Sequence, residues 1–396
     1  MLEVGGKIED GKLIIALEGR IDSLNAFEAE KSIGEWTKRY PDLPVVLDCD
    51  RLEHSTSAGL RVILRLKQKK KDVILINAHS ELYSILEMTG FTEMMEVRKA
   101  YRMISVEGCE MIGQGANGKV YRVDRDTIVK VYRNPEAISE IHRERELART
   151  AFVAGVPTAI PYDVVRVKEG GYGSVFELLN ASSYAGLLLK GEKTVEEVAG
   201  MSAQLLKTIH SRKVAPGVLP DMKKTVMGWI SFLEPSLPEE QINRLQELVG
   251  GIPDSLRMLH GDFHVKNVML QNGESLLIDM DTLCHGDPVF ELAAMYNAYV
   301  GFGALDPTLP EGFFGFSYNI SKTIWAETLK KYLETTDAEF LRKTEEKAKL
   351  IGLLRIMRRL IRHQELEHES GRAMMDYCRR ELADILSRVD TLACHE

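Results

Sequence analysis

The residues best suited to chemistry lie in one short segment, HGDFHVKN, which runs from position 260 to position 267. Apolar runs flank the segment on both sides, a pattern typical of a polar loop between two buried strands. Asp262 and Asn267 are five positions apart. At that separation one loop supplies both an acceptor for a hydroxyl proton and an amide oxygen for Mg²⁺. The spacing therefore predicts Asp262 as the catalytic residue and Asn267 as a metal ligand.

A second acidic motif follows in the segment IDMD, where Asp279 and Asp281 stand after an apolar run. Magnesium keeps water and substrate phosphates as ligands and requires only one or two protein carboxylates, so Asn267 and Asp279 suffice to hold it. Asp281 is a candidate for a second ion or a bound water. His260 is interpreted as a hydrogen-bonded anchor of the loop, because the carboxylate of Asp262 already fills the role of the base.

A glycine-rich segment, EMIGQGANGKVYRV, precedes these motifs and places Gly113, Gly115 and Gly118 between two strand-like runs. Glycines at the tip of a hairpin, rather than at the start of a helix, disfavour a dinucleotide-binding fold. They allow backbone N–H groups to approach phosphate oxygens without a side-chain clash. We therefore predict a hairpin that covers nucleotide phosphates.

The next strand, TIVKVY, carries Lys130 among apolar neighbours, so its ammonium group needs an anionic partner. The helical stretch that follows offers three carboxylates, those of Glu140, Glu144 and Glu146. A glutamate paired with Lys130 would hold the lysine toward nucleotide phosphates. Glu144 is favoured, and the sequence leaves the other two open.

The elements that position these motifs fall into two parts. Residues 1–100 show the pattern of an α/β unit, with strands over 12–19, 43–50 and 72–78 and helices over 25–40, over 57–71 and from Ser80 onward. Residues 101–108 are predicted to form a connector. The second part, 109–396, begins with the glycine-rich hairpin and is mostly helical from Thr194 onward, with a capping box expected at 236–239.

A helical segment near the C-terminus has an apolar stripe and a cationic face. The stripe comprises Leu353, Met357, Leu360 and Ile361, and the residues off it are Arg355, Arg358, Arg359 and Arg362. Charged residues that stay off an apolar stripe usually face solvent. We therefore expect these four arginines to be solvated.

Composition limits the class of protein further. Of the 396 residues, 44% are hydrophobic and 28% are charged, as in ordinary folded domains. The formal charge of −8 provides no global cationic field, so neither nucleic acid nor a membrane is an expected partner. Five cysteines without a C-x-x-C pair are expected to be reduced: Cys49, Cys109, Cys284, Cys378 and Cys394. Since no secretory leader pattern or long apolar segment is present, a cytoplasmic location is expected.

Taken in order, the glycine-rich hairpin, the I-V-K strand, the helical glutamate, H-G-D-x-H-x-x-N and I-D-x-D resemble the aminoglycoside phosphotransferase and choline kinase group of small-molecule kinases. The resemblance spans about 109–300. It implies an α+β bilobal protein kinase-like domain, with an N-lobe over about 109–180 and a mainly helical C-lobe over about 181–396.

The same resemblance assigns roles to the chemical residues. It implies that Asp262 is the catalytic aspartate, that Asn267 and Asp279 bind Mg²⁺, and that Lys130 clamps the phosphates of ATP. It also implies an adenine-contacting hinge at FELLN (176–180), which includes Glu177 and acts through its backbone.

One position departs from this group. The segment HGDPVFELAAM has Glu291 where the group usually has the aspartate of a D-L-A run. The side chain is one methylene longer, and its carboxylate is still able to cap the catalytic loop. The departure leaves the metal and base assignments unchanged.

Residues 1–100 resemble STAS domains, the α/β fold of anti-sigma factor antagonists. The resemblance lies in LEGRIDSLNA, in VVLDCDRLEHSTSAGLRVIL and in the closing ILEMTGF helix. Regulatory members are phosphorylated on the serine directly before the glycine of D-S-S-G-L, and here that position is Ala58. The resemblance therefore implies a regulatory or partner-binding module that lacks this switch unless Ser57 or Thr56 substitutes.

These observations predict an ATP- and Mg²⁺-dependent phosphotransferase that transfers the γ-phosphoryl group to a hydroxyl of a small molecule. One alternative is a STAS-based partner-switching or scaffold protein whose kinase-like domain only senses nucleotide. Another is a kinase that acts on a protein partner. The acceptor itself is not identified, because the helical region after residue 180 has no diagnostic motif. Glu239, Glu240 and Asp287 would suit a cationic substrate, but they are expected to be ordinary surface acids in a chain of this charge.

Overall fold

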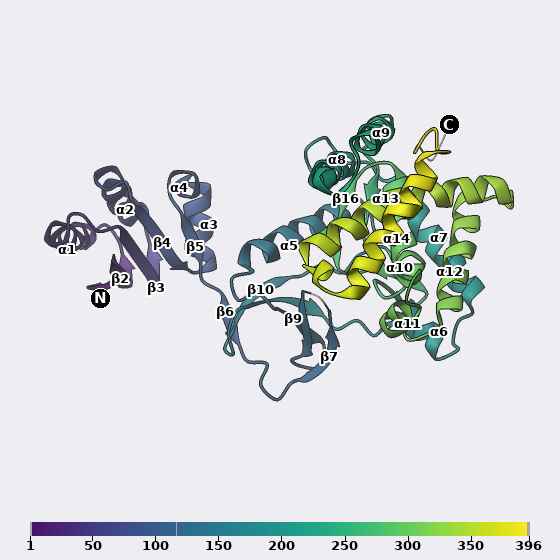
Figure 1. The fold of residues 1–396 in the computed structure, drawn as a ribbon. Coiled ribbons are helices and arrows are strands. Elements are labelled where there is room, and N and C mark those ends of the chain that lie inside the picture. The colour runs from purple at the N-terminus through teal and green to yellow at the C-terminus, as the bar shows by residue number, and fades with distance from the viewer. Residues whose placement is uncertain (1, 116, 394–396) are drawn as a thin grey trace. The chain divides into compact units, whose positions relative to one another are not determined.

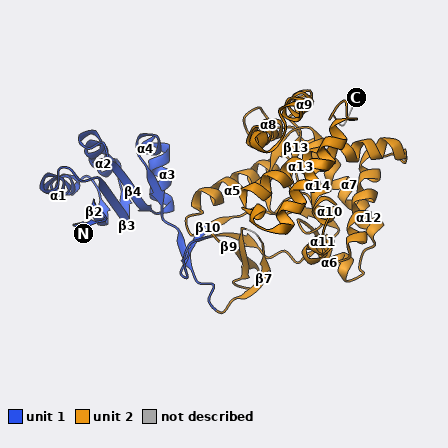
Figure 2. Cartoon of the chain, in the orientation of Figure 1, with its two compact units in different colours: residues 1–107, 164–172 blue, residues 108–163, 173–396 orange. Residues whose placement is uncertain are grey.

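The computed structural model describes residues 2–115 and 117–393, so Cys394 lies outside the described residues. The chain divides into two compact units (Figures 1 and 2). Unit 1 comprises residues 1–107 and 164–172, and unit 2 comprises 108–163 and 173–396. None of the helices in the described part of the chain is long and apolar enough to cross a membrane.

Unit 1 is built on a sheet whose described strands follow the order β1-β2-β3-β4-β5. β1 pairs with β2 in the antiparallel sense, and the remaining neighbours are parallel. The strands are β1 (Glu3–Glu9), β2 (Lys12–Ile21), β3 (Val45–Ser55), β4 (Val73–Ala78) and β5 (Val97–Lys99), and the helices are α1 (Ala26–Arg39), α2 (Ser57–Lys69), α3 (Ser80–Met88) and α4 (Phe91–Met94). The predicted strand and helix order of residues 1–100 is thus confirmed, with β1 and β5 added.

The core of unit 1 follows from alternation along the strands. Leu13, Ile15 and Leu17 of β2 are fully or almost fully buried, while intervening side chains are less so. Because successive side chains of a strand point to opposite faces, this pattern directs one face of β2 into the core. The amphipathic helix α2 adds Ile63 to the same cluster.

The predicted connector over 101–108 is wrong in part, because it contains a strand, β6 (Arg102–Ile104). β6 pairs in parallel with β10 (Asp163–Val167), with Arg102 opposite Val165 and Ile104 opposite Val167. This pairing groups residues 164–172 with the first part of the chain. Residues 164–172, which lie within the expected N-lobe over 109–180, thus belong to unit 1. The local sequence did not indicate this long-range parallel pairing.

The glycine-rich segment and Lys130 belong to a second sheet, whose described strands follow the order β6-β10-β11-β9-β8-β7. β7 (Glu110–Gln114) and β8 (Gly118–Arg122) form the predicted hairpin, and β9 (Thr127–Tyr132) lies beside β8. The helix α5 (Ile138–Val153) follows β9 along the chain, and β11 (Tyr172–Glu177) pairs with β9.

The rest of unit 2 is mainly helical, as expected. Short strands that frame the chemical loops are β12 (Ser182–Ser183), β13 (Met258–Leu259), β14 (Val268–Gln271), β15 (Glu274–Leu277) and β16 (Cys284–His285). The helices are α6 (Tyr184–Leu189), α7 (Val195–Ser211), α8 (Met222–Leu233), α9 (Glu239–Gly250), α10 (Pro288–Tyr299), α11 (Thr308–Phe314), α12 (Tyr318–Leu333), α13 (Ala338–Arg362) and α14 (Glu369–Leu386), with 3₁₀ turns η1 (Glu234–Ser236), η2 (Met280–Thr282), η3 (Gly301–Gly303) and η4 (Glu365–Glu367).

The start of α9 differs from the sequence prediction. The capping box expected at 236–239 is wrong, because Pro238 is the N-cap residue of α9 and Ser236 ends the turn η1. A proline has no side-chain oxygen with which to cap a helix. The serine and the glutamate matched the spacing of the motif, but the N-cap position lies two residues after the serine, and the helix begins at the glutamate itself.

Candidate active site

The predicted catalytic loop lies between β13 and β14, and its own backbone organises Asp262 and Asn267. The side-chain amide of Asn267 donates to the carbonyl oxygen of Asp262 at 3.0 Å. Because its Nδ2 group makes that bond, the amide oxygen Oδ1 of the same side chain is left for another ligand. The structure thus places Asp262 and Asn267, which the sequence spacing had suggested as a pair, side by side in one loop.

His260 is completely buried and anchors this loop. Its Nδ1 atom lies 3.3 Å from the backbone N–H of Asp262, and its Nε2 atom lies 3.1 Å from the carbonyl oxygen of Ile278. An N–H donor at one ring nitrogen and a carbonyl at the other correspond to a neutral imidazole that accepts at Nδ1 and donates at Nε2. The geometry fits the interpretation of His260 as an anchor rather than a base.

Glu291 caps the catalytic loop from α10 and is completely buried. Its carboxylate accepts from the backbone N–H groups of His260, Gly261 and Phe263, at 3.0 Å for Gly261 and 3.4 Å for Phe263. Burial alone would raise the pKa of Glu291, but the imidazole of His210 and the backbone N–H of Gly261 hold it below its usual range. The longer side chain therefore supports the loop despite the departure from aspartate.

The expectation that the arginines of α13 are solvated is wrong for Arg355, which contacts the predicted catalytic loop. It donates to the carbonyl oxygen of Gly261 at 3.1 Å, and its Nη2 atom lies 3.5 Å from Oδ1 of Asp262. Arg358 is partly buried and lies over the ring of Trp229, whereas the other two arginines, Arg359 and Arg362, are exposed as predicted. The sequence pattern missed Arg355 because the loop that it contacts is more than ninety positions away.

The fourth arginine of this group, Arg359, is exposed as predicted, and it also contacts two neighbours. It forms an ion pair with Glu365 at 3.4 Å, and its guanidinium lies 5.1 Å from the ring centroid of Phe302. Its side chain is nevertheless about half exposed. Arg359 thus covers an aromatic ring while its charge stays near solvent.

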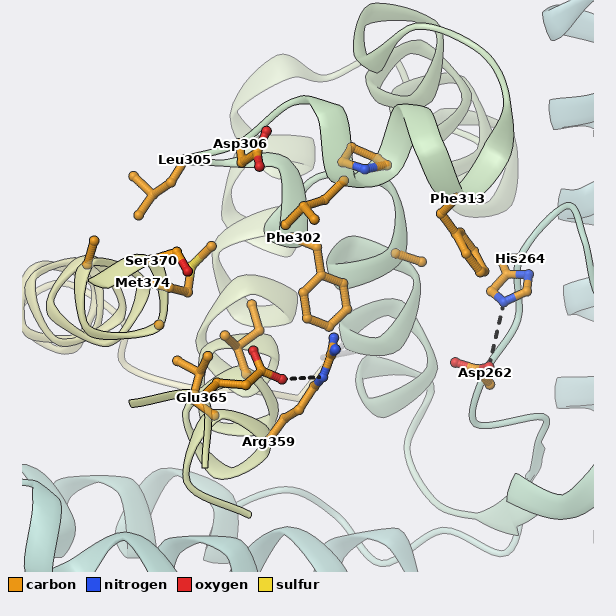
Figure 3. A pocket seen from close by; sticks show the side chains of 17 residues that line it. Asp262, His264, Phe302, Leu305, Asp306, Phe313, Arg359, Glu365, Ser370 and Met374 are labelled. Carbon is orange, nitrogen blue, oxygen red and sulfur yellow. Dashed lines mark ion pairs between the residues drawn. The ribbon is translucent and has the colours of Figure 1, made fainter. Parts of the chain in front are cut away.

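The carboxylate of Asp262 lies in a cationic environment. Burial alone would raise its pKa, but the neighbouring imidazole of His264 and the charge of Arg355 hold the pKa below its usual range. The Nε2 atom of His264 lies 3.6 Å from Oδ2 of Asp262 (Figure 3). At neutral pH the group is therefore ionised, as an acceptor for a proton must be.

Lys130 lies between two carboxylates, one of which is the predicted Glu144. Its Nζ atom is 2.8 Å from Oε1 of Glu144 and 2.6 Å from Oδ1 of Asp279. Burial alone would lower the pKa of Lys130, but the two carboxylates outweigh it and raise that pKa. The other candidates lie elsewhere, since Glu140 accepts from Asn134 and Glu146 pairs with Arg149.

Tyr132 is a supporting residue that sequence reasoning missed. Its hydroxyl donates to Oε2 of Glu144 at 2.6 Å and lies 3.1 Å from Oγ of Ser174. Tyr132 stands two positions after Lys130 on β9, so both side chains point to the same face of the sheet. That period of two was the available signal. The tyrosine occupies the second oxygen of Glu144 and so fixes the orientation of the carboxylate.

Asp279 has a left-handed backbone conformation, with φ of 64°. Such values are uncommon outside glycine and are enriched in aspartate and asparagine, and they cluster where a site requires a fixed side-chain direction. The neighbouring Asp281 accepts from the side chain of Asn117 at 2.7 Å. Burial and the charges of Asp279 and Glu144 raise the pKa of Asp281 to about 6.

The donor set around Asp279 fits Mg²⁺. One oxygen of Asp279 is bonded to Lys130, so its second oxygen is left for a cation, and Asn267 provides its amide oxygen. Both are the hard oxygen ligands that Mg²⁺ takes in proteins. A cation would also offset the repulsion between Asp279 and Asp281. Among the described residues no cluster of three or more histidine, cysteine or acidic side chains is positioned for a metal, and Mg²⁺ at a phosphate site needs none.

The predicted nucleotide-contacting glycines have different structural requirements. A Cβ atom at Gly118 would lie 2.1 Å from the carbonyl oxygen of Val131, so packing against β9 demands glycine there. A Cβ atom at Gly115 would meet nothing within 4 Å. The tip of the hairpin is therefore open at Gly115, where a ligand has room to approach the backbone. Glu177 ends β11, and its side chain is exposed.

A pocket of about 630 Å³ opens beside Asp262 and His264 (Figure 3). Its walls come from the ends of α10 and α13, from the turns η3 and η4, and from α11 and α14. The volume lies within the range of small-molecule sites. Glu239, Glu240 and Asp287 do not line it, and Asp287 is buried as the N-cap residue of α10.

In unit 1 the STAS-like motif opens α2. Thr56 is the N-cap residue, and its hydroxyl accepts from the backbone N–H of Ala58 at 3.3 Å. Ser57 is exposed in the first turn of the helix. The hydroxyl of Thr56 therefore has a structural role, whereas that of Ser57 is accessible.

A two-lobed fold with a glycine-rich hairpin, a lysine–glutamate pair and an Asp–Asn–Asp oxygen set defines the kinase-like class of phosphotransferases. Comparison with known families agrees. The model of the phosphotransferase enzyme family matches residues 108–318, more than half of the chain, and the chain belongs to this family. The STAS domain model matches residues 6–103, so the chain also carries an N-terminal STAS domain.

Individual relatives are similar to one part of the chain or the other. The anti-sigma factor antagonist BtrV of Bordetella bronchiseptica is 33% identical over 92 residues, which cover 22% of this chain and 78% of BtrV.

Among solved structures, the ADP-bound aminoglycoside phosphotransferase APH(2'')-Ib is 16% identical and has a TM-score of 0.48, with 78% of this chain and 99% of that chain covered. A thermostable mutant of aminoglycoside phosphotransferase APH(4)-Ia, in a ternary complex with ADP and hygromycin B, is 12% identical and has a TM-score of 0.49, with coverages of 77% and 97%. The family assignment rests on the family model, because both TM-scores are below 0.5.

Proposed function

We propose that unit 2 is an ATP- and Mg²⁺-dependent kinase that transfers the γ-phosphoryl group to a hydroxyl of a small molecule. The observation that carries the proposal is the position of Lys130, whose ammonium group contacts both Glu144 and Asp279. In kinases a lysine–glutamate pair must be formed, and the metal-binding aspartate must be in place, for phosphoryl transfer to occur. Support for the proposal comes from one contact network that contains both the lysine–glutamate pair and Asp279, the aspartate that we propose as a metal ligand.

Each residue has a role that follows from its chemistry. The ionised Asp262 would orient the acceptor hydroxyl and take its proton, and His260 and Glu291 would hold the loop that carries it. Asn267 and Asp279 would hold Mg²⁺, which neutralises phosphate charge when it is bound. Lys130, kept in place by Glu144, would position the phosphates below the glycine-rich hairpin, and the backbone of the segment at Glu177 would contact adenine.

We propose in addition that the STAS domain binds a protein partner. Support comes from the similarity of residues 6–103 to this domain and from the relative described as an anti-sigma factor antagonist. Ala58 has no hydroxyl, so a phosphorylation switch at that position is not part of the proposal.

The first test is the thermal stabilisation of the purified chain by ATP, with and without Mg²⁺. A ligand that binds only the folded state at a hundred times its Kd adds about 2.7 kcal/mol of stability. We expect Mg²⁺-dependent stabilisation in the wild type and its loss in Asp279→Ala. Absence of stabilisation by ATP and Mg²⁺ in the wild type would contradict the proposal.

The second test addresses Asp262 as the proton acceptor. Asp262→Asn should bind ATP as the wild type does, while acceptor-dependent ADP release falls by roughly 10²–10⁴-fold, the usual contribution of general base catalysis. Asp376→Asn is the matched control, because Asp376 is exposed on α14 and pairs only with Arg379 in the described structure. Unchanged turnover in Asp262→Asn would show that this carboxylate is not the base.

A further inference from the structure

The pocket beside Asp262 is lined mainly by apolar side chains. The larger apolar side chains of its lining include Phe302, Leu305, Leu309, Phe313, Leu360 and Met374. Leu305, Leu309 and Phe313 are between 45% and 52% exposed. Apolar surface that is exposed to water is unfavourable in proportion to its area. A ligand with an apolar body, bound in this concave surface next to the carboxylate of Asp262, would remove part of that surface from water.

The carboxylates of the pocket are already engaged. Asp306 accepts from the backbone N–H of Thr308 at 3.0 Å and from its hydroxyl at 2.6 Å. Glu365 pairs with Arg359 at 3.4 Å, as Figure 3 shows. Asp262 faces His264 and Arg355. Among the described lining residues, Asp306 alone has a carboxylate that forms no ion pair. An acceptor that carries several ammonium groups would therefore leave most of its charges without an acidic partner in this pocket.

We propose, on the basis of the proposed function, that the acceptor is a hydroxyl compound with an uncharged, largely apolar body. The body lies against Phe302, Leu309 and Phe313, and the hydroxyl points to Asp262 at the polar end of the pocket. The acceptor oxygen forms a bond to the γ-phosphorus of ATP, the bond from that phosphorus to the β–γ bridging oxygen breaks, and the hydroxyl proton passes to Asp262. ADP leaves with the bridging oxygen.

A series of ω-phenylalkanols, from 2-phenylethanol through 4-phenylbutan-1-ol to 6-phenylhexan-1-ol, tests this assignment on the full chain. We expect Kd, measured by calorimetry with and without ADP and Mg²⁺, to fall by up to about fourfold for each methylene that becomes buried. Acceptor-dependent ADP release should rise along the same series. Glycerol, a hydroxyl compound without an apolar body, and kanamycin, a polycation, should bind more weakly than 6-phenylhexan-1-ol.

A pair of variants localises the effect. Leu309→Asp places a charge on the apolar wall and should weaken the binding of 6-phenylhexan-1-ol at least tenfold. Val218→Asp is the matched control, since Val218 is 51% exposed, against 52% for Leu309, and lies outside the pocket. Circular dichroism melting of both variants checks that each is folded. Equal affinity in the two variants would overturn the assignment of this pocket.

The outcomes separate this inference from the proposed function. Preferential binding or phosphorylation of kanamycin would overturn the apolar acceptor while leaving the kinase intact. Binding of neither class, in a chain that ATP and Mg²⁺ stabilise, would also overturn it. Missing stabilisation by ATP and Mg²⁺ would contradict the kinase itself, and the alcohol titration without nucleotide would still decide whether the pocket takes an apolar body.

Discussion

Neutralising Glu291 should destabilise unit 2, because this side chain is the acceptor for the catalytic loop. The carboxylate is completely buried and accepts hydrogen bonds from the backbone N–H groups of His260, Gly261 and Phe263. Glu291→Gln keeps the shape but leaves one acceptor oxygen, and the new amide hydrogens face backbone donors. The substitution therefore removes charge-assisted hydrogen bonds and leaves buried N–H groups unpaired.

The magnitude follows from these contacts. A hydrogen bond to a charged group contributes about 1.5–3 kcal/mol, and an unpaired buried donor costs about 1–3 kcal/mol. Allowing for partial relaxation, the loss is about 3 kcal/mol of the free energy of unfolding of unit 2. For a domain of this size 1 kcal/mol corresponds to about 2–4 °C, so Tm should fall by about 6–12 °C.

Differential scanning calorimetry of the full chain measures this shift, with Glu274→Gln as the matched control on the exposed end of β15. Because the pKa of Glu291 is lowered in the folded state, its stabilisation is present above the unfolded-state pKa of about 4.3 and is lost as the pH falls through the folded-state pKa. The difference in Tm between the wild type and Glu291→Gln should therefore become smaller below about pH 4.3. A variant that melts within about 2 °C of the wild type at pH 7 would refute the capping argument.

Three further predictions follow from the site and from thiol burial. Lys130→Met should abolish stabilisation by ATP and Mg²⁺. It should also lower the free energy of unfolding by about 3–5 kcal/mol, because it leaves the buried Glu144 without its cation. The double variant with Glu144→Gln should recover stability, measured by chemical denaturation, but not turnover. Arg355→Met should lower kcat about tenfold with the KM for ATP unchanged, and Arg355→Lys should recover part of the rate, as steady-state kinetics can test; a change in KM alone would contradict a role in positioning Asp262. Native-state alkylation by iodoacetamide at pH 8, followed by mass spectrometry, should modify Cys109 before Cys49 and Cys378, since burial raises the pKa of the latter two to about 12; equal rates would contradict this ranking.

Local sequence was sufficient for the chemical motifs and for most of the elements that carry them. The loop from His260 to Asn267 was predictable because both residues belong to one short turn whose spacing is set by the chain itself. The order of strands and helices in residues 1–100 was predictable because a periodicity of two or 3.6 residues appears directly in the apolar pattern. The hairpin at Gly113 and Gly118 was predictable for the same local reason.

Motifs failed where local pattern and backbone disagreed. The spacing from Ser236 to Glu239 matched a capping box, but α9 begins after Pro238, and the residues at 101–108 contain a strand. The strand does not follow from short-range preferences, because its pairing with β10 joins segments about sixty residues apart. Long-range pairing can override weak local signals.

The sequence by itself determined which groups are able to do chemistry, since the identities and spacings of Asp262, Asn267, Asp279 and Lys130 are properties of the chain. Only the tertiary structure decided which glutamate pairs with Lys130 and that Arg355, placed on an apparently solvated helix face, contacts the catalytic loop. It also decided the apolar character of the pocket, whose walls come from helices and turns distant in sequence. The physical reason is that covalent spacing fixes neighbours only within a turn, whereas packing selects the partners between turns.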